Sequence, residues 1–123
     1  MKHSRGFLKI VSAAKKKIRE VTARSVKTRL KSGDRMTIID VREEHEWNKA
    51  RIAGSIHLGR GILERDIEKR IPDKKREIVL YCGGGFRSAL AAESLKRMGY
   101  RNVFSLRGGW RAWRRIGGPV EKE

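Results

Sequence analysis

Residues 77–98 most constrain what this chain can fold into. Residues 77–81 read Glu-Ile-Val-Leu-Tyr, a short apolar run with β-branched members that predicts a buried strand. The run ends at Cys82, and three consecutive glycines follow it. Residues 88–98 then have the spacing of a helix, which Gly99 is placed to end. A buried strand that passes through a glycine loop into a helix is typical of parallel α/β proteins.

The rest of the chain repeats this alternation of strands and helices. Residues 36–41 form a second apolar run, and residues 22–31 have helical spacing with Thr22 as the expected N-cap. The other expected helices are 7–17, 43–48, 62–70 and 110–116, and the other expected strands are 56–58 and 102–106. A chain of 123 residues has enough material for one core. The sequence therefore predicts a basic helical extension over residues 1–20 and one α/β domain over residues 21–121.

The single cysteine, Cys82, is the main candidate for chemistry. It cannot form an internal disulfide, a redox pair or a thiolate zinc site, so any thiol chemistry must start from it alone. We expect it at the carboxyl end of a parallel strand, where ligands bind in such sheets. The glycines let successive N–H groups turn inward, and the next helix N-terminus and Arg87 add positive potential. These features favour a thiolate nucleophile, whereas the alternative is an inert buried thiol.

Four ordered segments together resemble the rhodanese-like domain family. Residues 80–82 read Leu-Tyr-Cys and residues 87–89 read Arg-Ser-Ala, and this loop-separated pair resembles the active-site segment of the family. Residues 40–43, Asp-Val-Arg-Glu, are similar to the signature that follows its first strand. Residues 99–103 and 106–113 resemble its C-terminal strand and the Gly-Gly turn into its last helix. The resemblance implies a three-layer fold in which a small parallel sheet is flanked by helices.

The resemblance covers roughly residues 22–121, and the sequence departs from it in two places. Residues 51–55 read Arg-Ile-Ala-Gly-Ser, where the family more often has His-Ile-Pro-Gly-Ala. We expect this change to affect packing rather than chemistry. In the active loop, glycines replace the polar or basic side chains that many thiosulfate-using members carry. The second departure leaves the sulfur donor open.

The resemblance implies a sulfurtransferase of the thiosulfate:cyanide type that needs neither a metal nor an organic cofactor. The Cys82 thiolate attacks the outer sulfur of a donor such as thiosulfate, sulfite leaves, and a thiol or protein acceptor then removes sulfur from the cysteine persulfide. Loop N–H groups stabilise the terminal sulfur, and Arg87 attracts the anionic donor. The expected persulfide-binding loop consists of Gly83, Gly84, Gly85, Phe86 and Arg87, and the expected supporting residues are Asp40, Arg42 and Arg60. For His57, which has no second histidine at ligand spacing, we expect a structural role.

Two other functions compete with sulfur transfer. A thiol phosphatase or arsenate reductase also places a thiolate beneath N–H groups and an arginine. Four residues separate Cys82 from Arg87, a shorter loop than that of the tyrosine-phosphatase signature, and a tetrahedral oxyanion needs a wider cradle than one sulfur atom. A binding module that keeps the fold without turnover and holds a polyanion is the second alternative, and the intact Cys82 and Arg87 argue against it as the only role.

The formal net charge of +17 is concentrated near the N-terminus. Residues 1–35 contain 12 Lys or Arg and 2 acidic residues, whereas residues 36–123 contain 19 and 12. Such a basic arm attracts polyanions in a salt-dependent way, so nucleic acid, acidic proteins and anionic lipid are all candidate partners. A solvated helix face is the alternative explanation of the charge. No apolar run is long enough to span a membrane, and we expect a cytoplasmic protein.

Overall fold

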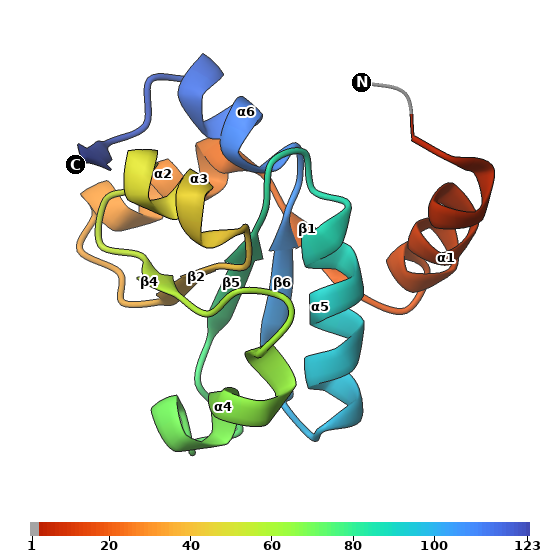
Figure 1. Cartoon of the computed structure of the whole chain (residues 1–123). Coiled ribbons are helices and arrows are strands. Elements are labelled where there is room, and N and C mark those ends of the chain that lie inside the picture. The colour runs from red at the N-terminus through yellow and green to blue at the C-terminus, as the bar shows by residue number, and fades with distance from the viewer. Residues whose placement is uncertain (1–2) are drawn as a thin grey trace.

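The computed structural model describes residues 3–123, in which a five-stranded parallel sheet forms the centre of the fold (Figure 1). The strand order is β1-β6-β5-β2-β4. The strands are β1 (Arg19–Val21), β2 (Thr37–Asp40), β4 (Ile56–His57), β5 (Ile78–Tyr81) and β6 (Val103–Leu106). A small antiparallel pair, β3 (Ala50–Ile52) and β7 (Val120–Lys122), lies beside it. β5 is the central strand, so the residue after it lies in the middle of the carboxyl edge of the sheet.

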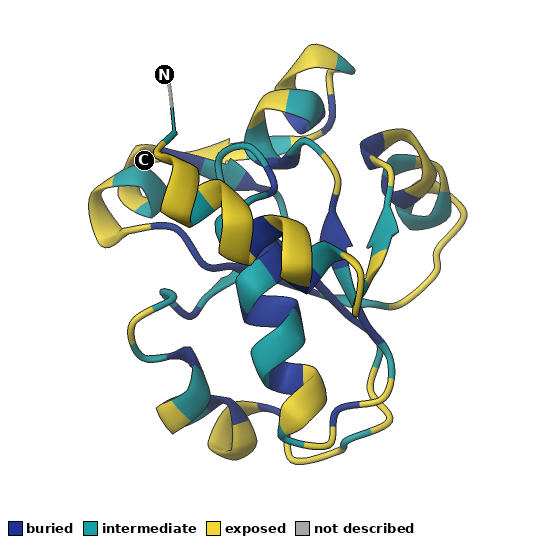
Figure 2. Ribbon diagram, turned by 90° about the vertical axis from the view of Figure 1, so that its right-hand side faces the viewer, coloured by how far each residue is buried: buried dark blue, intermediate teal, exposed yellow. Residues whose placement is uncertain are grey.

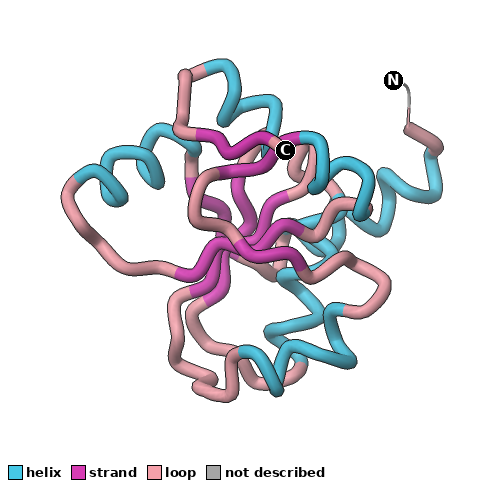
Figure 3. Tube along the Cα trace, turned by 60° about the vertical axis from the view of Figure 1, so that its left-hand side comes forward, coloured by secondary structure: helices cyan, strands magenta, loops and turns pink. Residues whose placement is uncertain are grey.

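Helices cover both faces of the sheet and give the three layers that the sequence predicted (Figure 3). The helices are α1 (Arg5–Lys15), α2 (Ala23–Lys31), α3 (Glu44–Lys49), α4 (Leu63–Arg70), α5 (Arg87–Arg97) and α6 (Gly109–Arg115). Successive strand residues point to opposite faces. Ile39 and Leu80 therefore pack in one cluster with residues of α4 and α5. Ile38 and Val79 pack in a second cluster with residues of α2 and α6.

The predicted helices and longer strands are present, with ends that shift by a few residues. The expected cap of α2 is confirmed, since the Thr22 hydroxyl accepts a hydrogen bond from Ser25 N at 3.1 Å. Three strands, β1, β3 and β7, were not predicted. Each has three residues, too few to show an alternation, and β1 carries the charged Arg19 and Glu20. These strands exist because tertiary partners pair with them, β1 with β6 and β3 with β7.

α1 is an amphipathic helix that packs on α5 through a narrow stripe. Val11 and Ala14 are its buried residues, and most of its other side chains are exposed. Figure 2 views the molecule from the side on which α1 lies and shows this mostly exposed surface. β1 follows α1 and crosses the predicted division between residues 1–20 and 21–121, and that division stays a prediction.

The segment that departs from the family pattern, residues 51–55, is tied to the central strand by Tyr81. The Tyr81 hydroxyl accepts a hydrogen bond from Ile52 N at 3.1 Å and lies 3.2 Å from the Ser55 hydroxyl. Ser55 in turn donates to Ile52 O at 2.6 Å, which closes a small buried network. Burial raises the pKa of Tyr81, so the phenol keeps its proton across the physiological range. Ser55 therefore belongs to a hydrogen-bond network of the core, and the expectation that this departure affects packing rather than chemistry stays a prediction.

Tyr81→Phe is expected to destabilise the protein by about 1–3 kcal/mol, because it leaves the buried Ile52 N–H without an acceptor. Urea denaturation measures the change in the free energy of unfolding. Ser32→Ala, which removes an exposed hydroxyl that bonds Thr28 O, is the control and is expected to change it by less than about 0.5 kcal/mol. Equal stabilities of Tyr81→Phe and wild type would contradict the role of this network.

Candidate active site

Cys82 lies directly after β5 and is 1% exposed. The loop that follows curls back over the thiol before α5 begins at Arg87. As a result, Gly85 N and Ser88 N donate hydrogen bonds to Cys82 Sγ at 3.2 and 3.3 Å. One of these donors lies in the loop and the other in the first turn of α5, and N–H groups that point at an atom favour negative charge on it. The structure thus brings the predicted cysteine and glycine loop together as a cradle of N–H groups.

The two glycine turns of the chain pack against each other at the base of this cradle. Gly85 has a φ of 92°, and a Cβ there would lie 3.0 Å from Gly108 N. A Cβ on Gly109 would collide with Cys82 O. Because both residues lack a side chain, Trp110 N approaches closely enough to donate to Cys82 O at 2.7 Å. The Gly-Gly turn before α6 therefore fixes the backbone of the cysteine itself.

Two buried serines, neither of them predicted as a site residue, extend the polar environment of the thiol. Ser88 Oγ lies 3.5 Å from Cys82 Sγ and 2.8 Å from Ser105 Oγ. Both serines are completely buried. Ser105 was detectable as a polar residue inside the otherwise apolar strand β6, but only the fold shows that it faces Ser88. Ser105 thus bonds the hydroxyl that contacts the sulfur.

Arg87 is only partly buried and borders the pocket above Cys82. Its Nη1 donates to Glu46 Oε2 at 3.3 Å, so α3 contributes a carboxylate that the sequence analysis did not place here. Burial alone would raise the pKa of Glu46, but hydrogen bonds from Glu43 N and Arg87 hold it below its usual value. Glu46 is therefore ionised at neutral pH and orients the Arg87 guanidinium.

The pocket has a volume of about 490 Å³ and reaches the thiol from the surface. Its lining residues are His3, Phe7, Glu46, Cys82, Gly83, Gly84, Phe86, Arg87 and Arg111. The predicted loop forms the base of the pocket. Gly85 is the exception, because it packs against the Gly-Gly turn and does not line the pocket. Arg111, His3 and Phe7 were not predicted as site residues, because they come from distant parts of the chain.

The predicted supporting residues lie outside this lining. Asp40 and Arg42 form a buried ion pair with Nη2 to Oδ2 at 2.8 Å. Arg42 also donates to Ala50 O at 2.7 Å and lies over the Trp110 ring, 4.7 Å from its centroid. The pair therefore supports Trp110, whose backbone N–H donates to Cys82 O. Arg60 donates a hydrogen bond to Glu64 of α4 at 2.7 Å. A role of Arg60 at the site stays a prediction.

His57 has structural contacts only. Its Nε2 lies 2.9 Å from Arg42 O, and its ring stacks on Trp47 with centroids 5.2 Å apart. Among residues 3–123 there is no cluster of three His, Cys, Asp or Glu side chains arranged to hold a metal ion.

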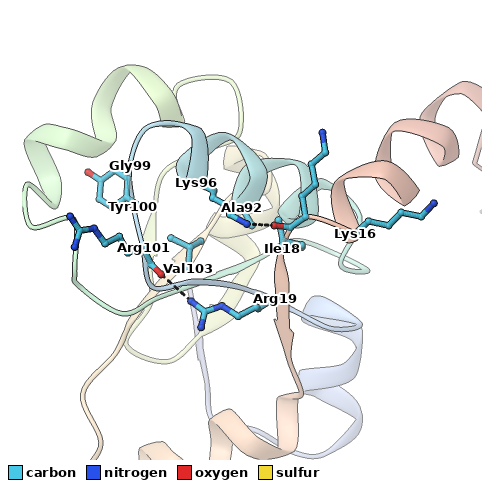
Figure 4. A pocket seen from close by; sticks show the side chains of 10 residues that line it. Lys16, Ile18, Arg19, Ala92, Lys96, Gly99, Tyr100, Arg101 and Val103 are labelled. Carbon is cyan, nitrogen blue, oxygen red and sulfur yellow. Dashed lines mark hydrogen bonds between the residues drawn. The ribbon is translucent and has the colours of Figure 1, made fainter.

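A second pocket of about 620 Å³ lies on the α1 side of the sheet (Figure 4). It is lined by Lys16, Lys17, Ile18, Arg19, Ala92, Lys96, Gly99, Tyr100, Arg101 and Val103. Among these described lining residues there is no carboxylate. Lys96 Nζ donates to Lys17 O at 2.7 Å and Arg19 to Arg101 O at 3.0 Å, so two of the cations are held in place. We call this pocket the basic groove.

Fold and site together define a parallel α/β protein that holds one cysteine in a cradle of N–H groups at the carboxyl edge of its sheet. The model of the Rhodanese-like domain family matches residues 22–116. The chain belongs to this family, as its sequence motifs predicted.

Three known proteins illustrate the relationship. The putative sulfur carrier protein YrkF of Bacillus subtilis is 34% identical over 98 residues, which are 78% of this chain and 51% of that protein, so the chain spans about half of its length. Thiosulfate sulfurtransferase GlpE of Coxiella burnetii is 33% identical over 79 residues, 64% of this chain and 72% of that one. The solved structure of RPA3614 of Rhodopseudomonas palustris, a protein of unknown function and possible tyrosine phosphatase, has a TM-score of 0.83 at 35% identity over 98% of each chain.

None of the helices within residues 3–123 is long and apolar enough to cross a membrane. The cytoplasmic location and the nucleic-acid partner stay predictions.

Asp40→Asn is expected to destabilise the protein by about 3–5 kcal/mol, because it leaves the buried Arg42 guanidinium without its counter-charge. Chemical denaturation of the variant and wild type measures this difference. Asp34→Asn removes a carboxylate that is 49% exposed and bonds Arg29, and as the matched control it is expected to cost less than about 1 kcal/mol. Equal losses in the two variants would show that the buried pair has no special role.

Proposed function

We propose that the chain is a rhodanese-type sulfurtransferase in which Cys82 carries sulfane sulfur as a persulfide. The observation that carries the proposal is the pair of N–H donors from Gly85 and Ser88 to the buried Cys82 Sγ. The relatives named sulfur carrier and thiosulfate sulfurtransferase support it. Donors aimed at an atom on which negative charge develops are a general means of transition-state stabilisation.

The first half-reaction loads the cysteine. The Cys82 thiolate attacks the outer sulfur of thiosulfate, a new Cys–S bond forms, and the S–S bond of the donor breaks. Sulfite leaves with the electron pair of that bond, and a cysteine persulfide anion remains. Arg87 and Arg111 at the pocket attract the anionic donor. In this exchange charge and sulfur balance without any redox partner.

The second half-reaction unloads the cysteine. A thiophilic acceptor, such as cyanide, a thiol or a protein thiolate, attacks the terminal sulfur, and the Cys82 thiolate leaves. Ser88 and the loop amides that hold Sγ before the reaction hold it again afterwards. The same contacts thus hold the Cys82 sulfur at the start and at the end of the cycle, which suits a residue that carries sulfane sulfur between two molecules.

A thiol phosphatase remains the enzymatic alternative, and the possible tyrosine phosphatase among the structural neighbours gives it a specific basis. The narrow cradle favours sulfur transfer. Gly85 N and Ser88 N are directed at Sγ itself, and the four-residue loop before Arg87 is short for a tetrahedral phosphoryl group.

The basic groove favours a second and compatible role in binding single-stranded RNA. Five of its lining residues are Lys or Arg, and the groove runs between the start of β1 and the second half of α5. Lys17 is partly neutralised by Glu93 at 3.4 Å, whereas Lys16 and Arg101 have no carboxylate among the ion pairs of residues 3–123. Clustered cations of this kind bind a phosphate backbone without regard to base sequence.

Cys82→Ser is expected to abolish sulfur transfer, lowering turnover of thiosulfate and cyanide by at least about 1,000-fold. Intact mass spectrometry after thiosulfate treatment is expected to show one added sulfur on wild type and none on Cys82→Ser. Hydrolysis of p-nitrophenyl phosphate is measured on the same samples. Cysteine-dependent phosphate release without an added sulfur would favour the phosphatase instead.

RNA binding, if it uses the basic groove, is expected to weaken steeply with salt, with a log–log slope of about −0.7 for each phosphate contacted. The double variant Lys16→Gln/Arg101→Gln is expected to make this slope shallower by about 1 to 1.5 in fluorescence anisotropy titrations of a single-stranded oligonucleotide. Lys69→Gln/Arg70→Gln, which removes two exposed cations of α4, is the matched control. A slope that both variants change equally would assign binding to net charge and not to the groove.

A further inference from the structure

The N-terminal segment 3–15 lies over the active loop, although it is outside the residues that match the family model. The His3 ring packs on the Phe86 ring with centroids 4.6 Å apart. Phe7 lies 5.2 Å from His3 and 6.2 Å from Phe86 by the same measure. All three rings line the pocket that contains Cys82. The loop and the N-terminal segment therefore share one aromatic wall.

Packing holds this wall in place. Val11 and Ala14 of α1 are buried, and α1 lies on α5, the helix that begins at the active loop. Lys15 Nζ sits 5.0 Å from the centroid of the Phe86 ring. Ser4 caps the helix by accepting a hydrogen bond from Phe7 N at 3.4 Å. Phe7 thus occupies a fixed position at the start of a helix that the core anchors.

The two sides of the pocket differ in chemistry. His3, Phe7 and Phe86 supply aromatic surface, whereas Arg87 and Arg111 supply positive charge. The volume of about 490 Å³ falls in the range of sites for small organic molecules, about 300–1,000 Å³. An inorganic ion such as thiosulfate would leave most of the aromatic surface without a contact. The pocket matches an anion that also carries an apolar group.

The aligned part of the R. palustris structure supports a structural role for the segment. That alignment covers 98% of this chain, so it continues well beyond residues 22–116 and takes in α1. The aligned region of the two proteins therefore includes a segment N-terminal to the residues that match the family model.

We propose that His3, Phe7 and Phe86 form an aromatic subsite of the active-site pocket, which binds the apolar group of an organic anionic sulfur donor of the thiosulfonate class. The subsite rests on the proposed sulfur transfer at Cys82. The Cys82 thiolate attacks the outer sulfur of R–SO₂–S⁻, the new Cys–S bond forms, and the bond between the two donor sulfurs breaks. The sulfinate R–SO₂⁻ leaves with the electron pair. The reacting atoms are those of thiosulfate, and an R group replaces one oxygen.

The test compares benzenethiosulfonate with thiosulfate, because the two donors share their reacting atoms. Stopped-flow kinetics of Cys82 persulfide formation, checked by intact mass, give a second-order rate constant for each donor. The ratio of the benzenethiosulfonate constant to the thiosulfate constant is expected to fall about fivefold in Phe7→Ala, since an aromatic contact of ordinary strength is lost. Phe7→Leu, which keeps bulk without the ring, is expected to fall between wild type and Phe7→Ala. Ile10→Ala removes a side chain of α1 that is 53% exposed and outside the pocket, and the ratio is expected to stay at the wild-type value.

Calorimetric binding of benzenesulfonate, which cannot react, separates the subsite from the sulfur chemistry. Its dissociation constant is expected to rise about fivefold in Phe7→Ala and to stay unchanged in Ile10→Ala. Unchanged binding and an unchanged donor ratio in Phe7→Ala would overturn the subsite even where wild type transfers sulfur. Weaker binding in Phe7→Ala together with no sulfur transfer by wild type would retain the aromatic subsite and refute the proposed function.

Discussion

The contact between two glycine turns determines the geometry of everything around Cys82. The loop after β5 and the turn before α6 approach so closely that a Cβ on Gly109 would collide with Cys82 O and a Cβ on Gly85 would lie 3.0 Å from Gly108 N. This approach lets Trp110 N bond Cys82 O at 2.7 Å and Arg111 N bond Gly83 O at 3.1 Å. With the carbonyls of Cys82 and Gly83 held in this way, Gly85 N of the loop and Ser88 N of α5 point toward the sulfur. The cradle is thus a product of tertiary packing as much as of loop sequence.

The buried ion pair supports the same region from the opposite side. Arg42 is held by Asp40, bonds Ala50 O and lies over Trp110, so it connects the end of β2 to β3 and to the start of α6. Burial alone would lower the pKa of Arg42, but its hydrogen bonds to Asp40 raise the pKa above its ordinary value. A cation that stays charged inside the protein needs this partner, and the segment 40–43 supplies both members. In this chain, the segment that resembles the family signature therefore has a structural role away from Cys82.

Sequence patterns identified the parts of the fold and site that depend on local order. The strand β5, the cysteine after it and the glycine loop follow each other directly, and apolar runs long enough to read define β2 and β5. The parts that were not predicted depend on partners distant in the chain. Ser105 faces Ser88 and Glu46 meets Arg87 only once the sheet is assembled. His3 and Phe7 reach the pocket because α1 folds back on α5, and the basic charge of that segment gave no sign of this.

The donors that hold the sulfur of Cys82 are main-chain amides, and this has a consequence for how such a site changes over evolutionary time. Substitution to any residue except proline keeps the backbone N–H group, so these donors depend on the backbone path and on the glycines that permit it, and not on the chemistry of a side chain. The side chains that line the pocket, by contrast, come from α1, α3, α5 and α6, from the loop and from the segment before α1. A fold arranged in this way separates the main-chain groups that hold the sulfur of Cys82 from the side chains that shape the pocket above it.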